Sequence, residues 1–223
     1  SWATHVNDKV YLYYSGWQRG YSIPYNNYTG LAISSDGGYS FEKYAHGPVI
    51  DRTPWEIYSA TSPGCLVDDN GVWHMLYCSG THWHVINEKY EHVYDIKYAF
   101  SYNGKEWKQT GQSAIKQNNE YEGITRPTTI KWDDGSYHSW YCYRGAEDFR
   151  NGDQSYRIGY AVSSDMIHWQ RHDEQAGIFT SPNEWDSKMQ AYPSVFRVED
   201  RLLMFYNGND FGRSGFGYAL MDI

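Results

Sequence analysis

The chain has 223 residues, of which 40% are hydrophobic, so it is long enough to bury a substantial core as one domain. Its formal net charge of -8 argues against a phosphate-backbone partner, which would call for a basic face. No apolar run approaches the roughly 20 residues of a membrane span. We therefore expect neither a nucleic-acid nor a membrane partner. The first residues, SWATHVNDKVYLYY, show no signal-peptide pattern, and the sequence leaves the cellular compartment open.

Four copies of one strand pattern follow one another along the chain. In each copy an apolar run ends in glycine and is followed by a run built around an alanine. The apolar runs are VYLYYSG, VWHMLYCSG, YHSWYCYRG and LLMFYNG, and the alanines are Ala32, Ala99, Ala161 and Ala219. A period of about sixty residues, with short strands and no long helical segment, is typical of propeller blades. The sequence predicts an all-β chain, one β-propeller domain over residues 1–223, with repeats at about 1–50, 56–115, 120–180 and 186–223.

The first and last repeats are shorter than the two between them. SWATHV aligns with SPGCLV, so the chain starts inside the first strand of a blade, and the last repeat stops after its third strand. Two interpretations follow. One is a five-bladed type of propeller that lacks material at its N-terminus or closes by self-association, and the other is a four-bladed ring.

Neither the cysteines nor the loop residues predict a metal ion or another cofactor. Cys65, Cys78 and Cys142 follow no metal-ligand or disulfide spacing, and we expect three buried thiols, with one disulfide as the alternative. The segment HWH places His82 and His84 on one side of an extended chain, and EDFRNGD gathers three acids. Either group could hold an ion, but loop histidines and acids are more often solvated.

The connections between the predicted strands are of two kinds. The A–B and C–D turns of each blade are short and generic, for example Asp36-Gly37 and Asn103-Gly104. The B–C loops are long and rich in aromatic and polar residues: GWQRGYSIPYNNY, GTHWHVINEKYEHVY, GAEDFRNGDQSY and GNDFGRSG. In an antiparallel blade these loops share one face of the disc with the D-to-A crossovers. We expect a ligand on that face, because function concentrates in loops held by a rigid scaffold.

An acidic residue stands seven positions before an inner-strand proline three times. The pairs are Glu56 with Pro63, Glu120 with Pro127, and Asp186 with Pro193. Each acid lies in a D-to-A crossover, on the predicted ligand face. Glycosyl transfer needs one carboxylic acid to protonate the leaving oxygen and a carboxylate that acts as nucleophile or activates water or phosphate, so the three acids are candidate catalytic residues. The alternative is that each acid only starts a crossover at the rim, bonded to backbone N–H groups.

The blade phrases carry a family resemblance. GYAVSSDMIHWQRH, GLAISSDGGYSFEK and KYAFSYNGKEWKQ resemble the repeats of the five-bladed propeller glycosidases, the superfamily of invertase, arabinanase and β-mannoside phosphorylase. The closest likeness, through SYHSWYCYRG and AYPSVFRVEDRLLMFYNGNDFGRSGFGYA, is to uncharacterised glycosidase-like propellers often encoded near surface-polysaccharide genes. It covers essentially the whole chain. The resemblance implies a carbohydrate partner and a glycoside hydrolase or phosphorylase acting on an oligo- or polysaccharide; the alternative is a noncatalytic sugar-binding propeller.

The sequence departs from that family at one position in each of the last three repeats. Invertase and arabinanase relatives commonly place acids directly before or close to the inner-strand proline, where this chain has Ser62, Arg126 and Tyr192. Arg126 is expected to bind a sugar carboxylate or phosphate through its planar guanidinium, or to form an ion pair with Glu120 or Glu122. Such a pair would lower the pKa of Glu120 and leave Glu56 or Asp186 as the general acid.

Aromatic residues make up 18% of the chain. Many fill strand cores, but Tyr and Trp in loops also suit stacking on sugar rings. The candidate substrate-binding residues are Arg126, Tyr192, Tyr58, Trp17, Trp83, Arg144 and Asn209.

Overall fold

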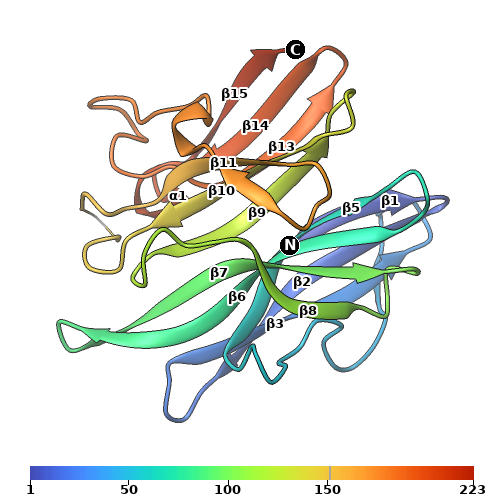
Figure 1. The fold of residues 1–223 in the computed structure, drawn as a ribbon, viewed down its shortest axis with the longest axis horizontal. Coiled ribbons are helices and arrows are strands. Elements are labelled where there is room, and N and C mark those ends of the chain that lie inside the picture. Colours follow the sequence, from blue (N-terminus) through green and yellow to red (C-terminus); the bar gives the residue numbers. More distant parts are fainter. Residues whose placement is uncertain (151) are drawn as a thin grey trace.

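The computed structural model describes residues 1–150 and 152–223, and its strands form four successive antiparallel blades (Figure 1). Blade one contains β1 (Trp2–Val6), β2 (Lys9–Arg19), β3 (Tyr25–Ser34) and β4 (Glu42–Lys43), and blade two contains β5 (Ser59–Val67), β6 (Trp73–Ile86), β7 (Lys89–Ser101) and β8 (Lys108–Ile115). Blade three contains β9 (Gly123–Lys131), β10 (Tyr137–Arg144), β11 (Arg157–Ser163) and β12 (Trp169–Arg171), and blade four contains β13 (Ala191–Val198), β14 (Arg201–Asn207) and β15 (Phe216–Asp222). Two short helices, η1 (Asp173–Gln175) and α1 (Asn209–Gly212), lie in connections. The predicted all-β propeller class is confirmed.

The inner strand of each blade contacts the inner strand of the next, so that β1, β5, β9 and β13 follow one another around a common axis. Blades one and two are also joined by a short parallel pairing of β3 with β5, at Asn27–Ser59 and Tyr28–Ala60. This pairing was not expected from the sequence, and it merges the first two blades into one continuous sheet.

The core consists of layers between neighbouring blades. Along β6, Met75 and Tyr77 pack toward blade one, whereas Leu76 packs toward blade three. Along β10, Tyr141 joins the layer shared with blade two, and Trp140 joins the layer shared with blade four. Successive side chains of a strand point to opposite faces of the sheet. A strand covered on both faces is therefore apolar throughout, which explains the continuous apolar runs of the sequence.

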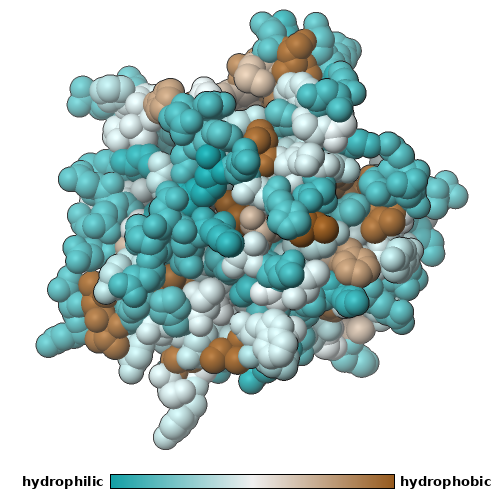
Figure 2. All heavy atoms as spheres, viewed as in Figure 1, coloured by the Kyte–Doolittle hydropathy of each residue, from teal (hydrophilic) through white to brown (hydrophobic). Residues whose placement is uncertain are grey.

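The outward face of blade four is largely exposed. In this face Leu203 lies opposite Leu220 and Phe205 lies opposite Tyr218. Phe216, Tyr218 and Leu220 are 72%, 64% and 56% exposed. Figure 2 shows hydrophobic atoms at the top of the molecule, where β15 ends. Trp2 of blade one reaches this face and stacks on Phe196, with 6.5 Å between the ring centroids. Both interpretations of the number of blades, and self-association, stay predictions.

Cys65, Cys78 and Cys142 are buried free thiols, as the sequence predicts, and burial raises the pKa of each to about 12. Among the described residues, no helix has the length and apolar character needed to cross a membrane.

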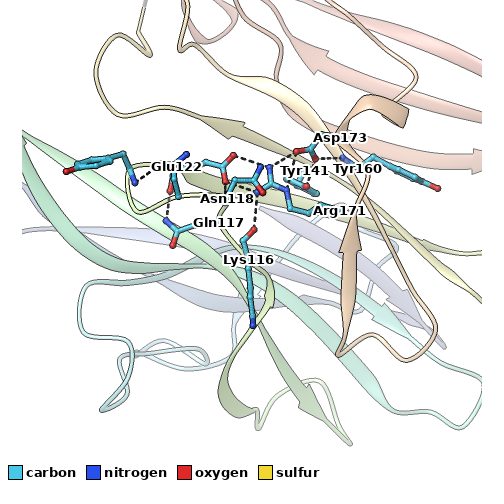
Figure 3. A network of polar contacts seen from close by, with 10 residues as sticks. Lys116, Gln117, Asn118, Glu122, Tyr141, Tyr160, Arg171 and Asp173 are labelled. Atoms are coloured by element: carbon cyan, nitrogen blue, oxygen red, sulfur yellow. Dashed lines mark hydrogen bonds and ion pairs between the residues drawn. The ribbon is translucent and has the colours of Figure 1, made fainter.

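A buried polar network joins the entry of blade three to its last strand (Figure 3). The guanidinium of Arg171 donates to Glu122 through Nη1 and Nη2 at 2.7 and 3.0 Å, and to Asp173 through Nη2 at 2.5 Å. Tyr141 donates its hydroxyl to Asp173 Oδ1 at 2.5 Å. Arg171 also donates to the carbonyl oxygen of Lys116 at 3.0 Å. One arginine therefore holds two carboxylates and the crossover from blade two.

We expect Arg171→Ala to lower the free energy of unfolding by about 3 to 5 kcal/mol, because it leaves two largely buried carboxylates without their cation. The measurement is urea unfolding followed by tryptophan fluorescence. The control is Arg197→Ala, which removes an exposed ion pair with Asp133 and should leave the unfolding midpoint unchanged. Equal shifts in the two variants would contradict the structural role of the Arg171 network.

Candidate functional site

Each of the three later inner strands carries a β-bulge at the residue before proline. The φ angles of Ser62, Arg126 and Tyr192 are 48°, 58° and 59°. At each bulge the pairing register shifts, so that two residues of the inner strand lie opposite one residue of the next strand. A bulge bends the strand and re-aims its side chains. Ser62 and Tyr192 accordingly face a cavity near the axis.

Two adjoining cavities lie near the axis, and we call them together the axial pocket. The inner cavity has a volume of about 140 Å³, and the outer cavity about 450 Å³. Five residues line both cavities: Tyr25, His92, Tyr94, Tyr156 and Tyr192. The lining comes from the inner strands and from the B–C connections, as the loop asymmetry predicts. A larger cavity of about 640 Å³ lies elsewhere, between β8 and β12.

The inner cavity contains buried polar atoms without partners. Asn27, Ser59 and His92 line it, and their atoms Asn27 Oδ1, Ser59 Oγ and His92 Nε2 make no hydrogen bond in the described part of the chain. A buried polar atom without a hydrogen bond costs free energy, so such atoms are usually satisfied by water or ligand. Three of them around one small cavity indicate a place for a molecule that both donates and accepts hydrogen bonds.

Aromatic rings form the wall between the two cavities. Trp17 lies 4.6 Å from Tyr25, and Tyr25 lies 4.9 Å from Trp83, measured between ring centroids. Trp83 stacks on His92 at 4.1 Å with an angle of 8° between the ring planes. Trp17 is 67% exposed at the mouth of the inner cavity. Trp83 and His92 thus form a stacked pair in the wall, and the exposed ring of Trp17 is accessible to a ligand.

His92 is a neutral hydrogen-bonding group at physiological pH. Burial, then the positive charge of Arg144, then His82 lower the pKa of His92 to about 3. His92 lines both the inner and the outer cavity, and the residue is only 4% exposed. The neutral imidazole is able to donate or accept at Nε2, according to its tautomer.

Arg144 is a buried residue of the outer cavity lining, and it contacts several other residues of the axial pocket. Its Nε donates to the hydroxyl of Tyr94 at 3.1 Å and its Nη1 donates to the carbonyl oxygen of Gly145 at 2.8 Å. The guanidinium also lies 3.9 Å from the ring centroid of Phe149. The hydroxyls of Tyr94 and Tyr156 are hydrogen-bonded to each other. The predicted substrate-binding residue Arg144 thus orients the tyrosines that line both cavities.

Two of the candidate acids are completely buried outside this pocket. Glu56 accepts hydrogen bonds from the Tyr77 hydroxyl at 2.6 Å and from Gln109 Nε2 at 2.8 Å. Asp186 accepts from Gln190 Nε2 at 2.8 Å and from the Tyr206 hydroxyl at 3.1 Å. Both acids are 0% exposed. Each carboxylate therefore serves as the acceptor for a strand tyrosine within its own blade.

The third candidate acid, Glu120, is exposed, and its carbonyl oxygen accepts from His84 Nε2 at 3.2 Å. The expected ion pair of Arg126 with Glu120 or Glu122 is wrong. Glu122 is paired with Arg171 instead, and Arg126 makes no ion pair within the described residues. The physical reason is the bulge at Arg126, which places that side chain and the crossover acids in different surroundings.

The structure brings together four of the predicted binding residues. Trp17 and Tyr192 line the inner cavity, and Trp83, Arg144 and Tyr192 line the outer one. Arg126 holds the bulge position that corresponds to Ser62 and Tyr192. Tyr58 and Asn209 do not line the axial pocket, although the Tyr58 ring lies 6.4 Å from that of His92. Asn209 Oδ1 instead accepts from the backbone N–H groups of residues 188 and 189 at 2.8 and 3.0 Å.

Sequence reasoning missed Glu91 and His92, two neighbouring residues of β7. Glu91 is 3% exposed, lines the outer cavity and accepts two hydrogen bonds from Arg150 at 2.6 and 3.0 Å. The signal was present in the strand KYEHVYDIKYAF, where Glu91, His92, Asp95 and Lys97 interrupt a strand that is apolar and buried on both faces. Buried charged residues need partners, so their density in one strand indicates a special environment.

No metal site is evident in the described residues, where no three histidine, cysteine, aspartate or glutamate side chains are placed to hold an ion. The Nε2 atoms of His82 and His84 lie 2.8 Å apart and form a pair.

The fold is that of the propeller glycosidases, as the blade phrases predict. A complex of BT0996 with RGII aligns with a TM-score of 0.75 at 16% identity, over 99% of this chain and 64% of that protein. A thermostable family-43 glycoside hydrolase aligns with a TM-score of 0.72 at 19% identity, over 99% and 69%. A structure from the GH130 family of mannoside phosphorylases aligns with a TM-score of 0.65 at 20% identity, over 92% and 58%.

Sequence comparison identifies the family. The uncharacterized proteins MT1551 and Rv1502, from strains CDC 1551 / Oshkosh and ATCC 25618 / H37Rv of Mycobacterium tuberculosis, are each 33% identical to this chain over 218 residues. The alignment covers 97% of this chain and 69% of each relative. The chain belongs to the family of these two proteins. No protein-family model matches the sequence.

The first prediction from the site concerns the buried acids. Glu56→Ala should lower the free energy of unfolding by about 1 to 3 kcal/mol, because the Tyr77 hydroxyl and the Gln109 amide lose their acceptor. The exposed Glu120→Ala should change it by less than about 0.5 kcal/mol. Urea unfolding of both variants measures the difference. An unchanged stability of Glu56→Ala would contradict the structural role.

The second prediction concerns pH. Between about pH 3 and 6.5 the unfolded chain binds a proton at His92 that the folded chain does not, so His92 lowers stability as the pH falls through this range. At pH 5 this loss amounts to about 2 kcal/mol relative to pH 7. We expect His92→Gln to flatten the fall in unfolding free energy, measured by urea titration at both pH values. The exposed variant His5→Gln should keep the wild-type fall, and equal pH dependence in all three proteins would exclude this role of His92.

Proposed function

We propose that the axial pocket binds an oligo- or polysaccharide and that the protein is carbohydrate-active. The observation that carries this proposal is the group of unpartnered atoms, Asn27 Oδ1, Ser59 Oγ and His92 Nε2, beside an aromatic wall. A sugar has hydroxyls that donate and accept hydrogen bonds, and C–H faces that pack on Tyr and Trp rings. The fold shared with glycoside hydrolases supports the same conclusion.

The proposed activity is cleavage of a glycosidic bond by hydrolysis or phosphorolysis. Glu91 is a carboxylate in the lining of the outer cavity. As the acceptor of a bidentate bond from Arg150, it suits the role of a carboxylate base or nucleophile better than that of a proton donor. The burial of Glu56 and Asp186 and the position of Glu120 outside the pocket support structural or surface roles for those three acids.

The second candidate function is sugar binding without catalysis. It is favoured by the composition of the pocket: of the described residues that line its two cavities, Glu91 is the one acid, and it is held in an ion pair. Two facing carboxylates, as glycosidases use them, are not found among those residues.

A glycan-binding screen together with an aryl-glycoside screen, with and without phosphate, tests the proposal. Trp17→Ala should weaken binding of any glycan found by about three- to tenfold, because a sugar loses one stacking surface. The control is Trp55→Ala, which removes a tryptophan of nearly equal exposure, 66% against 67%, that does not line the axial pocket. Equal affinity of both variants would remove Trp17 from the site, and release of aryl alcohol would establish an enzyme.

A further inference from the structure

The axial pocket is positively charged in a protein that is acidic overall. The formal net charge of the chain is -8. In the outer cavity, however, Lys89, Arg144 and Arg150 line the wall, against the single described acid Glu91. The pair of Glu91 and Arg150 is internally balanced, which leaves Lys89 and Arg144 in excess. A local excess of one sign on a surface of the opposite sign points to a ligand that supplies the missing charge.

Arg126 adds a further cation beside the inner cavity. It follows Thr125, which lines that cavity, and its bulge position corresponds to those of the lining residues Ser62 and Tyr192. Its Nη1 is buried without a hydrogen-bond partner, and no ion pair of Arg126 is formed within residues 1–150 and 152–223. Burial lowers the pKa of Arg126. A guanidinium nitrogen that is buried without an acceptor or counter-charge is costly, and a bound anion would remove that cost.

Arg144, like Arg126, has no carboxylate partner among the described residues. It is 2% exposed, and its hydrogen-bond acceptors are neutral: the Tyr94 hydroxyl and the carbonyl oxygens of Gly145 and His92. A guanidinium carries five N–H donors, so these three bonds do not use all of them, and Arg144 lines the outer cavity. No carboxylate of the described chain forms an ion pair with Arg144.

The two arginines act on one region of the molecule. Burial raises the pKa of the Cys142 thiol to about 12, while the charges of both Arg126 and Arg144 act to lower it. Cys142 is itself 0% exposed, and its Sγ lies 3.5 Å from the carbonyl oxygen of Thr125, a residue of the inner cavity lining. Arg126 and Arg144 lie on the paired strands β9 and β10, so both positive charges belong to blade three.

We propose that the axial pocket recognises an anionic saccharide, whose carboxylate or phosphate oxygens are bound on the side of Arg126 and Arg144 while its ring packs against the aromatic wall. This inference rests on the proposed carbohydrate function and adds the charge class of the ligand. The planar guanidinium of Arg126 matches two oxygens of a carboxylate or phosphate, which a lysine ammonium does not. The oxyanion belongs to a uronic acid, to a sugar phosphate or to inorganic phosphate that accompanies a sugar.

The experiment is isothermal titration calorimetry of the full chain with matched pairs of ligands. The probes are glucuronate with glucose, galacturonate with galactose, mannose 6-phosphate with mannose, and inorganic phosphate alone. We expect at least one acidic member to bind about tenfold or more tightly than its neutral partner, and this preference to shrink in about 0.5 M salt. Arg126→Ala should reduce the preference to about twofold or less, and Arg126→Lys should restore only part of it.

The control variant Arg197→Ala removes a guanidinium from the other end of β13, where it pairs with Asp133, and should keep the wild-type preference. Thermal unfolding checks that each variant is folded, and the salt dependence of the wild type tests the inference even if Arg126→Ala does not fold. Tight binding of uronates identifies a sugar carboxylate as the source, and binding of phosphate alone identifies phosphate. Equal binding of acidic and neutral partners would overturn the anionic inference and leave the carbohydrate function standing, whereas no binding by any probe would contradict both.

Discussion

The structure depends on one repeated constraint, a proline bulge opposite a tyrosine. In blade two, Ser62 and Pro63 together lie opposite the single residue Tyr77, and the same pairing places Tyr141 and Tyr206 opposite the bulges of β9 and β13. Proline has no N–H to give to the ladder, so the pairing is interrupted there at little further cost. A non-glycine residue at positive φ costs about 1 kcal/mol, and strain of this kind is common where side chains are held for function. Here it turns the residue before proline out of the regular strand, toward the inner cavity in blades two and four.

The tyrosines opposite the bulges account for two of the three recurring acids, Glu56 and Asp186. Each hydroxyl would be buried without a partner if no acceptor reached it, and each donates to a carboxylate of its own blade. The pairs are Tyr77 with Glu56, Tyr141 with Asp173, and Tyr206 with Asp186. In blades two and four the acid comes from the crossover before the blade, and in blade three it comes from η1 after β12. Each of these three blades thus has an acid beside its buried tyrosine, but in blade three that acid is Asp173 and not the recurring Glu120.

The sequence predicted the repeat architecture well because strand periodicity, glycine ends and the sixty-residue period are local signals. Of the residues that it assigned to the ligand face, Ser62, Tyr192, Trp17 and Trp83 line the axial pocket, and their role in binding stays a prediction. It could not give the direction of the crossover acids, since an irregular segment has no periodicity that assigns a side chain to the axis or to the sheets. The expected ion pair of Arg126 with Glu120 or Glu122 does not form, because the bulge at Arg126 separates side chains that are close in the sequence. Glu91 and His92 were missed because they lie within a strand that reads as core.

The charged residues of the scaffold and those of the axial pocket have different partners. Scaffold carboxylates accept hydrogen bonds from tyrosines and amides or pair with Arg171, and the chain as a whole has a formal charge of -8. At physiological salt that overall charge acts over only about 8 Å, so it does not determine what a buried pocket attracts. Inside the pocket the local dielectric is low, and the nearest unpaired groups dominate. Under the proposed recognition of an anionic saccharide, selectivity would therefore depend on the guanidinium groups without carboxylate partners and on the neutral His92, and little on the net charge of the chain.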